Sequence, residues 1–244
     1  MTMSQRENTI HQANHQIARA AGTVMVAYIL SNLAGLLAKM LTANAFGTGM
    51  ESEAFYAANR FSEILFNLVA GGALGSAFIP TFTGFLVRKD REGAWRLASA
   101  IINWVLLILV IFSVLSMLFA RQVVQYVLAP GFSTVSVEKE LLTAALLRIQ
   151  IPSAIIFGLS GLVMGILNAH QRFFISALAP GMYQLGWIFG ALVLAPRYGV
   201  YGLSYGILIG ASFHLFVQIP ALLKLPRVRY RLALGRGDPA VREV

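Results

Sequence analysis

Long uncharged apolar runs, separated by short polar loops, constrain this chain more than any other feature of its sequence. One run, Ile64–Val87, has 24 residues, and two others, Ala20–Ala38 and Leu97–Phe119, have 19 and 23. A helix of about 20 apolar residues crosses the hydrocarbon core of a bilayer. With further runs near 141–167, 173–196 and 198–223, the sequence predicts six membrane-spanning helices.

Composition agrees with this fold class, an all-α polytopic membrane protein. The chain is 57% apolar and 12% charged, against roughly 25% charged residues in an average soluble domain. It has no cysteine, which excludes disulfides, thiol catalysis and cysteine-based metal sites. The net charge of +9 sits mostly in short loops between apolar runs, a pattern that indicates membrane orientation rather than nucleic-acid binding.

The basic residues also predict which way the chain crosses the membrane. With a cytoplasmic N-terminus, six spans place thirteen Lys and Arg residues on the cytoplasmic side and three (Arg121, Lys139 and Arg197) on the outer side. Cytoplasmic loops of membrane proteins carry such an excess. We therefore expect residues 1–19 and 224–244 in the cytoplasm, flanking a six-helix lobe at 20–223. Asp238-Pro239 is a helix-start signal and predicts a further helix after the last span.

Two polar stripes accompany the first two apolar runs. Polar or small residues recur at 32, 35, 39 and 42, and again at 60, 63, 67 and 71. Spacings of three and four place such residues on one helix face. Charged groups at membrane depth usually face a protein interior or a water-filled cavity. The stripes predict cavity-lining residues, namely Asn32, Lys39, Arg60, Glu63 and Asn67.

One alternative remains open, because Arg60 and Glu63 precede the apolar run and are also compatible with a solvated pair at the membrane surface. Helices joined by a short loop are usually antiparallel neighbours, so we expect the two stripes to face each other, which would allow Lys39 to neutralise Glu63. A lone His214 in the last span suits a proton relay, although a hydrogen-bonded packing role is the better expectation.

Six short strings along these spans resemble the MurJ/MviN family of lipid II flippases, members of the multidrug/oligosaccharidyl-lipid/polysaccharide exporter superfamily. They are FGTGMESEAFYAANR (46–60), GGALGSAFIP (71–80), LAPGF (128–132), GILNAHQRF (165–173), ALAP (177–180) and QIPALLKL (218–225). They occur in the family's order and spacing. The resemblance implies that this chain corresponds to the N-terminal of two six-helix lobes around a central cavity, and that Glu53 joins Arg60 among the polar cavity positions.

The sequence departs from the family where the family's arginines are thought to meet the substrate diphosphate. The first-helix pattern S-R-x-x-G-x-x-R-D reads SNLAGLLAK over residues 31–39, and the second-helix pattern R-R-x-x-A-E-G reads FNLVAGG over residues 66–72. Arg offers a bidentate fork that Lys lacks. The substrate expectation is therefore weaker than the fold expectation.

The sequence contains no recognisable nucleophile, metal cluster or nucleotide loop, so it predicts a transporter without a cofactor rather than an enzyme. The leading expectation is a flippase lobe in the bacterial cytoplasmic membrane that moves a lipid-linked saccharide diphosphate by alternating access. Its partners are membrane lipids and a C-terminal lobe or second chain, with no nucleic acid. The alternatives are export of another polyprenyl-linked saccharide or a drug, and a non-transporting paralogue. A reading frame that continues past Val244 would favour transport.

Overall fold

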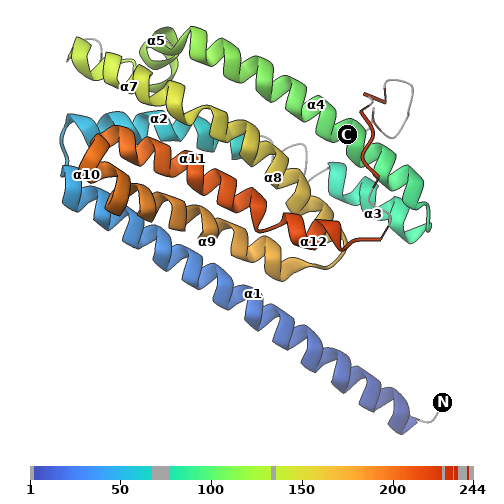
Figure 1. The fold of residues 1–244 in the computed structure, drawn as a ribbon. Helices are drawn as coiled ribbons and strands as arrows, with labels where there is room; N and C mark the ends of the chain where they lie inside the picture. The colour runs from blue at the N-terminus through green and yellow to red at the C-terminus, as the bar shows by residue number, and fades with distance from the viewer. Residues whose placement is uncertain are drawn as a thin grey trace.

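The computed structural model describes residues 3–67, 77–132, 136–226, 229–232, 234–235 and 241, with side chains from residue 21 onward. Within these ranges the secondary structure is helical, which confirms the predicted all-α class (Figure 1). The elements are α1 (Met3–Phe46), α2 (Met50–Asn67), α3 (Ile79–Val87), α4 (Arg91–Leu118), α5 (Ala120–Val123), the π-helix η2 (Val124–Leu128), α7 (Val137–Gln150), α8 (Pro152–Ala169), α9 (Phe173–Phe189), the π-helix η3 (Gly190–Leu194), α10 (Ala195–Tyr198), α11 (Val200–Phe216) and α12 (Ile219–Leu223).

Five stretches of the described chain are long and apolar enough to cross a membrane: 21–46, 91–118, 137–169, 173–198 and 200–223. They match five of the six predicted spans. The remaining span, expected as one helix over 64–87, lies partly outside the described residues. Its first turn belongs to α2, which begins at Met50 rather than near Ile64, and its end is α3. The span over 64–87 therefore stays a prediction.

Two hydrophobic clusters form the core, one toward each end of the helix bundle. The first joins α2, α7 and α11 around Phe55, Leu147 and Leu203, and lies near the end that carries α10. The second joins α3, α4 and α8 around Phe82 and Leu97, near the end that carries α12. Helix α8 continues the line of α7 and connects the two clusters, so the bundle has a continuous interior.

Glycines bring α9 and η3 into backbone contact with α11. A Cβ placed on Gly186 would lie 2.2 Å from the Cα of Gly210, and one on Gly190 would lie 2.7 Å from the Cα of Gly206. Small residues permit this approach between membrane helices. Of the glycines at 199, 202, 206 and 210, the last three lie at such close approaches. Gly199 instead has φ of +58° and precedes the first turn of α11.

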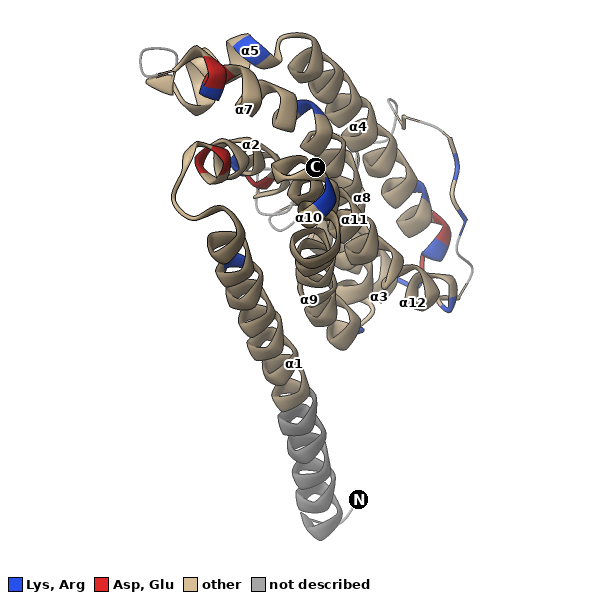
Figure 2. Cartoon of the chain, turned by 60° about the vertical axis from the view of Figure 1, so that its left-hand side comes forward, with Lys and Arg blue, Asp and Glu red and all other residues tan. Residues whose placement is uncertain are grey.

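Helix α1 packs along α9 and lies away from α2 except near the loop that joins them (Figure 2). Its packed face carries Ala27, Ser31, Ala38 and Thr42, all buried. The opposite face of α1 exposes large apolar side chains, among them Leu30, Leu33 and Met40. The predicted antiparallel packing of α1 against α2 is therefore wrong, because α9 occupies the position beside α1.

Candidate functional site

The polar stripe of α2 forms an exposed face of that helix. Glu53, Arg60, Glu63 and Asn67 are all exposed, whereas Phe55, Ala58, Phe61, Ser62 and Leu65 on the other side are buried. We call the four exposed residues the polar face of α2. Because apolar residues recur on one side of the helix and polar residues on the other, burial of the apolar side against α7 and α8 turns the polar face outward.

At the α10 end of the bundle, Glu53 forms an ion pair with Lys139 of α7. The Nζ of Lys139 also lies 4.0 Å from the centroid of the Phe132 ring. Close by in sequence, Glu140 is 1% exposed and accepts a hydrogen bond from Arg121 Nε at 2.5 Å. Glu53 therefore joins α2 to α7 as well as lying on the polar face.

Glu63 is oriented by its own helix. The amide Nδ2 of Asn59, which is buried, donates a hydrogen bond to Glu63 Oε1 at 2.7 Å. The hydroxyl of Tyr183 on α9 lies near both residues. Ion pairs among the described residues include neither Arg60 nor Lys39. Neither the alternative pair of Arg60 with Glu63 nor the possible pair of Lys39 with Glu63 is therefore among the ion pairs of the described residues.

The predicted stripe on α1 divides between two environments. Asn32 and Lys39 are exposed, and Asn32 Nδ2 donates to the carbonyl of Tyr28 at 2.9 Å. Gly35 instead faces Gln184 of α9, and Thr42 accepts a hydrogen bond from Trp187 Nε1 at 3.0 Å. Positions 35 and 42 lie roughly 60–80° around the helix from position 32, since each residue turns about 100°. That rotation is enough for α9 to cover them.

A second set of polar groups lies buried between helices. Ser160 Oγ lies 2.6 Å from His214 Nδ1, and Gln218 Nε2 donates to Ser160 Oγ at 2.6 Å. In the other half of the bundle, Gln150 Nε2 donates to Ser204 Oγ at 2.8 Å. His214 is 3% exposed and lies within hydrogen-bond distance of Ser160, as the expected packing role requires. Sequence analysis missed Ser160, Gln218 and Ser204, because single polar residues in apolar runs have no spacing that links them.

The site thus has two parts on separate helices. The polar face of α2 and the exposed pair Asn32 and Lys39 on α1 offer hydrogen-bonding groups, two cations and two carboxylates. In Figure 2 the charged residues of α1 and α2 lie toward one end of the molecule, and those at the start of α4 lie toward the other end. No group of three or more metal-ligating side chains occurs among the described residues. The arrangement suits binding of a polar or charged group by charge and hydrogen bonds.

Comparison with known proteins gives a consistent result. The family model "Lipid II flippase MurJ" matches residues 42–244. The lipid II flippase MurJ of Burkholderia cenocepacia is 30% identical, over 86% of this chain and 41% of its own length. A probable lipid II flippase MurJ of Buchnera aphidicola is 28% identical, over 88% of this chain and 43% of its own length. The chain spans less than half the length of these relatives.

Solved structures share the fold. A lipid II flippase MurJ in an inward closed conformation superposes with a TM-score of 0.76 at 27% identity, covering 90% of this chain and 45% of that protein. A transporter of the MOP superfamily from Pyrococcus furiosus superposes with a TM-score of 0.66 at 17% identity, covering 90% of this chain and 48% of that protein. The second likeness concerns the fold alone.

Proposed function

Because the chain belongs to the lipid II flippase MurJ family, we propose that it is one lobe of a transporter that moves a lipid-linked saccharide diphosphate across the bacterial cytoplasmic membrane. The chain is a multi-pass membrane protein by its helices and its family. The observation that carries the proposal is the exposed polar face of α2. Charged groups at membrane depth persist where they face protein or water. A second lobe, or a second chain, would close a hydrated cavity over this face.

In this proposal the substrate head group lies between the lobes while its polyprenyl chain stays in lipid. Arg60 and Lys39 attract the diphosphate. Asn32 and Asn67 contribute hydrogen bonds, and Glu63, held by Asn59, balances the charge. Glu53 is engaged by Lys139, so it contributes less to the field at the head group. Transport requires these groups to bind and release, with no bond broken and no cofactor.

The test is translocation by the protein that contains this lobe together with its partner lobe, reconstituted in proteoliposomes. Arg60→Ala and Lys39→Ala are expected to lower the initial rate on the order of tenfold or more, because a hydrogen bond to a charged group contributes roughly 1.5–3 kcal/mol. Arg197→Ala, which removes an exposed arginine at the α10 end, is the matched control. Unchanged rates in both variants, with normal folding, would remove the cavity proposal.

Orientation belongs to the same proposal. We place the α12 end of the bundle, with Lys89, in the cytoplasm and the α10 end, with Tyr198, outside, following the thirteen-to-three distribution of basic residues. Both residues are exposed and the chain has no cysteine, so Lys89→Cys and Tyr198→Cys are clean reporters. Ala94 is fully buried and makes a poor reporter. A membrane-impermeant thiol reagent applied to intact cells should label position 198 only. Labelling of position 89 alone would reverse the orientation.

A second candidate function is export of a different polyprenyl-linked saccharide or a drug. The specific observation is the composition of the exposed face, where Asn32 stands in place of an arginine of the family pattern, and where Glu63 offsets part of the charge of Arg60 and Lys39. Such a face lacks the bidentate guanidinium group that the family pattern has at position 32. Competition of a neutral or cationic amphiphile for translocation, stronger than competition by a lipid diphosphate, would favour this candidate.

A further inference from the structure

The segment that follows α12 returns along α4. We call residues 229–232 and 234–235 the C-terminal segment. Asn103 Nδ2 donates to the carbonyl of Arg231 at 3.0 Å, and Trp104 Nε1 donates to the carbonyl of Leu234 at 3.0 Å. The amide of Arg231 donates to Ser99 Oγ at 3.1 Å. Side chains of one face of α4 therefore satisfy backbone groups of this segment, as backbone groups removed from water require.

Side chains of the C-terminal segment alternate between two hollows on α4. Arg229 and Arg231 line one hollow, near the start of the helix. Tyr230, Leu232 and Leu234 line the other, farther along it. Alternation with a period of two is typical of an extended chain. The segment thus presents a basic side and an apolar side to the same helix.

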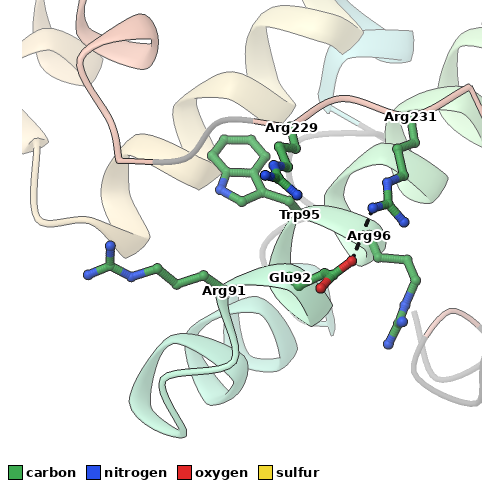
Figure 3. Close-up of a pocket in the computed structure, with 6 residues that line it drawn as sticks. All are labelled: Arg91, Glu92, Trp95, Arg96, Arg229 and Arg231. Atoms are coloured by element: carbon green, nitrogen blue, oxygen red, sulfur yellow. Dashed lines mark hydrogen bonds and ion pairs between the residues drawn. The ribbon is translucent and has the colours of Figure 1, made fainter.

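The basic hollow contains four arginines and one carboxylate. It has a volume of about 90 Å³ and is lined by Arg91, Glu92, Trp95 and Arg96 of α4 together with Arg229 and Arg231. Arg231 Nη2 forms an ion pair with Glu92 Oε1 at 3.0 Å. Figure 3 shows Arg91 and Arg96 extending to opposite sides of Glu92, while the C-terminal segment brings two arginines from above. Arginines therefore outnumber carboxylates in the lining of this hollow, which favours an oxyanion.

The apolar hollow lies beside it along α4. It has a volume of about 770 Å³, within the roughly 300–1,000 Å³ of small-molecule sites. From α4 it is lined by Leu106, Leu107 and Val110. From the C-terminal segment it is lined by Leu232, whose side chain is 90% exposed. Between Arg96 of the basic hollow and Asn103 of the apolar one, the helix rises about 10 Å. One amphiphile with an anionic head and an alkyl chain can therefore occupy both.

We propose that this double hollow binds an anionic phospholipid, with its phosphodiester among the arginines and one acyl chain against Leu106, Leu107 and Val110. Basic pockets at the membrane surface next to spanning helices bind anionic head groups in this way. The apolar hollow favours a lipid over a free phosphate, which would use only the basic part. The lipid is a bound component of the fold, separate from any molecule transported along α1 and α2. Its occupancy fixes the C-terminal segment to α4.

Hydrogen exchange of the C-terminal segment tests the proposal on the full chain in nanodiscs. Addition of phosphatidylglycerol to phosphatidylcholine discs is expected to slow exchange of the C-terminal segment on the order of tenfold. A lipid that binds only when this segment is packed on α4 stabilises the packed state, from which backbone amides exchange slowly. The double variant Arg91→Gln/Arg229→Gln should lose this slowing. The control variant Arg172→Gln/Arg197→Gln, which removes the same charge from exposed positions elsewhere, should keep it. Native mass spectrometry should show one retained phosphatidylglycerol, lost in Leu107→Gln.

Further arms separate the sources of the anion. Equal protection by millimolar glycerol 1-phosphate in phosphatidylcholine discs would overturn the lipid assignment. Protection by a polyprenyl diphosphate and not by phosphatidylglycerol would overturn the assignment to a membrane phospholipid. Identical exchange in the two kinds of disc, or full protection of the Arg91→Gln/Arg229→Gln variant, would overturn the site itself. None of these readouts depends on transport, so they are independent of the proposed function.

Discussion

Polar residues occupy two regions of this helical bundle, with opposite surroundings. Between α8 and α11, Ser160, His214 and Gln218 are buried and bonded to one another. Lys39, Arg60 and Asn67 are exposed on α1, whose residues 21–46 are long and apolar enough to cross a membrane, and on α2, which follows it. A buried polar group is stable when its hydrogen bonds are satisfied within the protein. An exposed one on a spanning helix requires water or a partner, so the same residue types indicate packing in one region and a ligand surface in the other.

The largest effect is expected in the packed region, which should not tolerate added volume. Tolerance of a large side chain there would contradict the comparison. Gly206→Leu is expected to abolish recovery of monodisperse protein, because even a Cβ there would lie 2.6 Å from the Cα of Gly190. Overpacking costs about 3 kcal/mol or more where backbones touch. Size-exclusion chromatography after membrane extraction measures the loss. Gly84→Leu, a position with open space around it, is the control and should behave like the parent.

Water access to the two faces of α2 gives the next largest effect. In the cysteine-free chain, expressed in cells with its native partners, Arg60→Cys and Asn67→Cys should react with a small water-soluble thiol reagent. Ala58→Cys, on the buried side, should react on the order of tenfold more slowly or not at all, because only a hydrated thiolate is nucleophilic. Equal rates at positions 58 and 60 would contradict the division into a packed and a hydrated face.

The buried network predicts a loss of stability without a loss of transport. His214→Leu should lower the free energy of unfolding by about 1–3 kcal/mol, because Ser160 loses one of its two hydrogen-bond partners. Thermal unfolding followed in detergent measures this change. A double-mutant cycle with Ser160→Ala isolates the pair, and a coupling energy near zero would contradict the bond. Translocation per folded molecule should stay at the parent rate. A selective loss of transport would assign His214 to the mechanism instead.

The smallest effect is expected at the partly exposed ion pair between Glu53 and Lys139. Glu53→Gln should change the free energy of unfolding by about 0.2–1 kcal/mol, as is usual for pairs that water screens. Glu140→Gln makes the matched comparison, because the Glu140 side chain is 1% exposed and bonded to Arg121. Its midpoint of thermal unfolding should fall further than that of Glu53→Gln. Equal changes in the midpoint would show that burial does not make the Glu140 ion pair contribute more to stability than the Glu53 ion pair.

Much of the fold follows from the sequence, because spans depend on local apolar runs. Five predicted spans agree with the described helices, and the face of α2 with Glu53, Arg60 and Asn67 is exposed as a cavity wall requires. The stripe of α1 was predicted less well. Gly35 and Thr42 are covered by Gln184 and Trp187 of α9, residues far away in the chain. Periodicity describes the faces of one helix and contains no information about which helix lies beside it.

Contacts between distant segments explain the other omissions. The bonds from Asn103 and Trp104 to the C-terminal segment join residues almost 130 positions apart, and Ser160 meets His214 across 54. No local pattern marks either pairing. The expected pair of Lys39 with Glu63 failed for the same reason, since α1 lies along α9. The Asp238-Pro239 helix start falls outside the described residues and stays a prediction.

The glycine contacts between α9 and α11 have a mechanical consequence. The backbones of α9 and α11 meet at Gly186 with Gly210, and those of η3 and α11 meet at Gly190 with Gly206. Sliding these helices past each other would cause collision, so we expect α9, η3 and α11 to move together. Helix α1 packs on that pair through side chains, and Trp187 donates a hydrogen bond to Thr42 there. Shear between packed helices is easiest where side chains rather than backbones form the contact. Displacement of the Lys39-bearing helix along the α9–α11 pair is therefore the shear motion that these contacts favour.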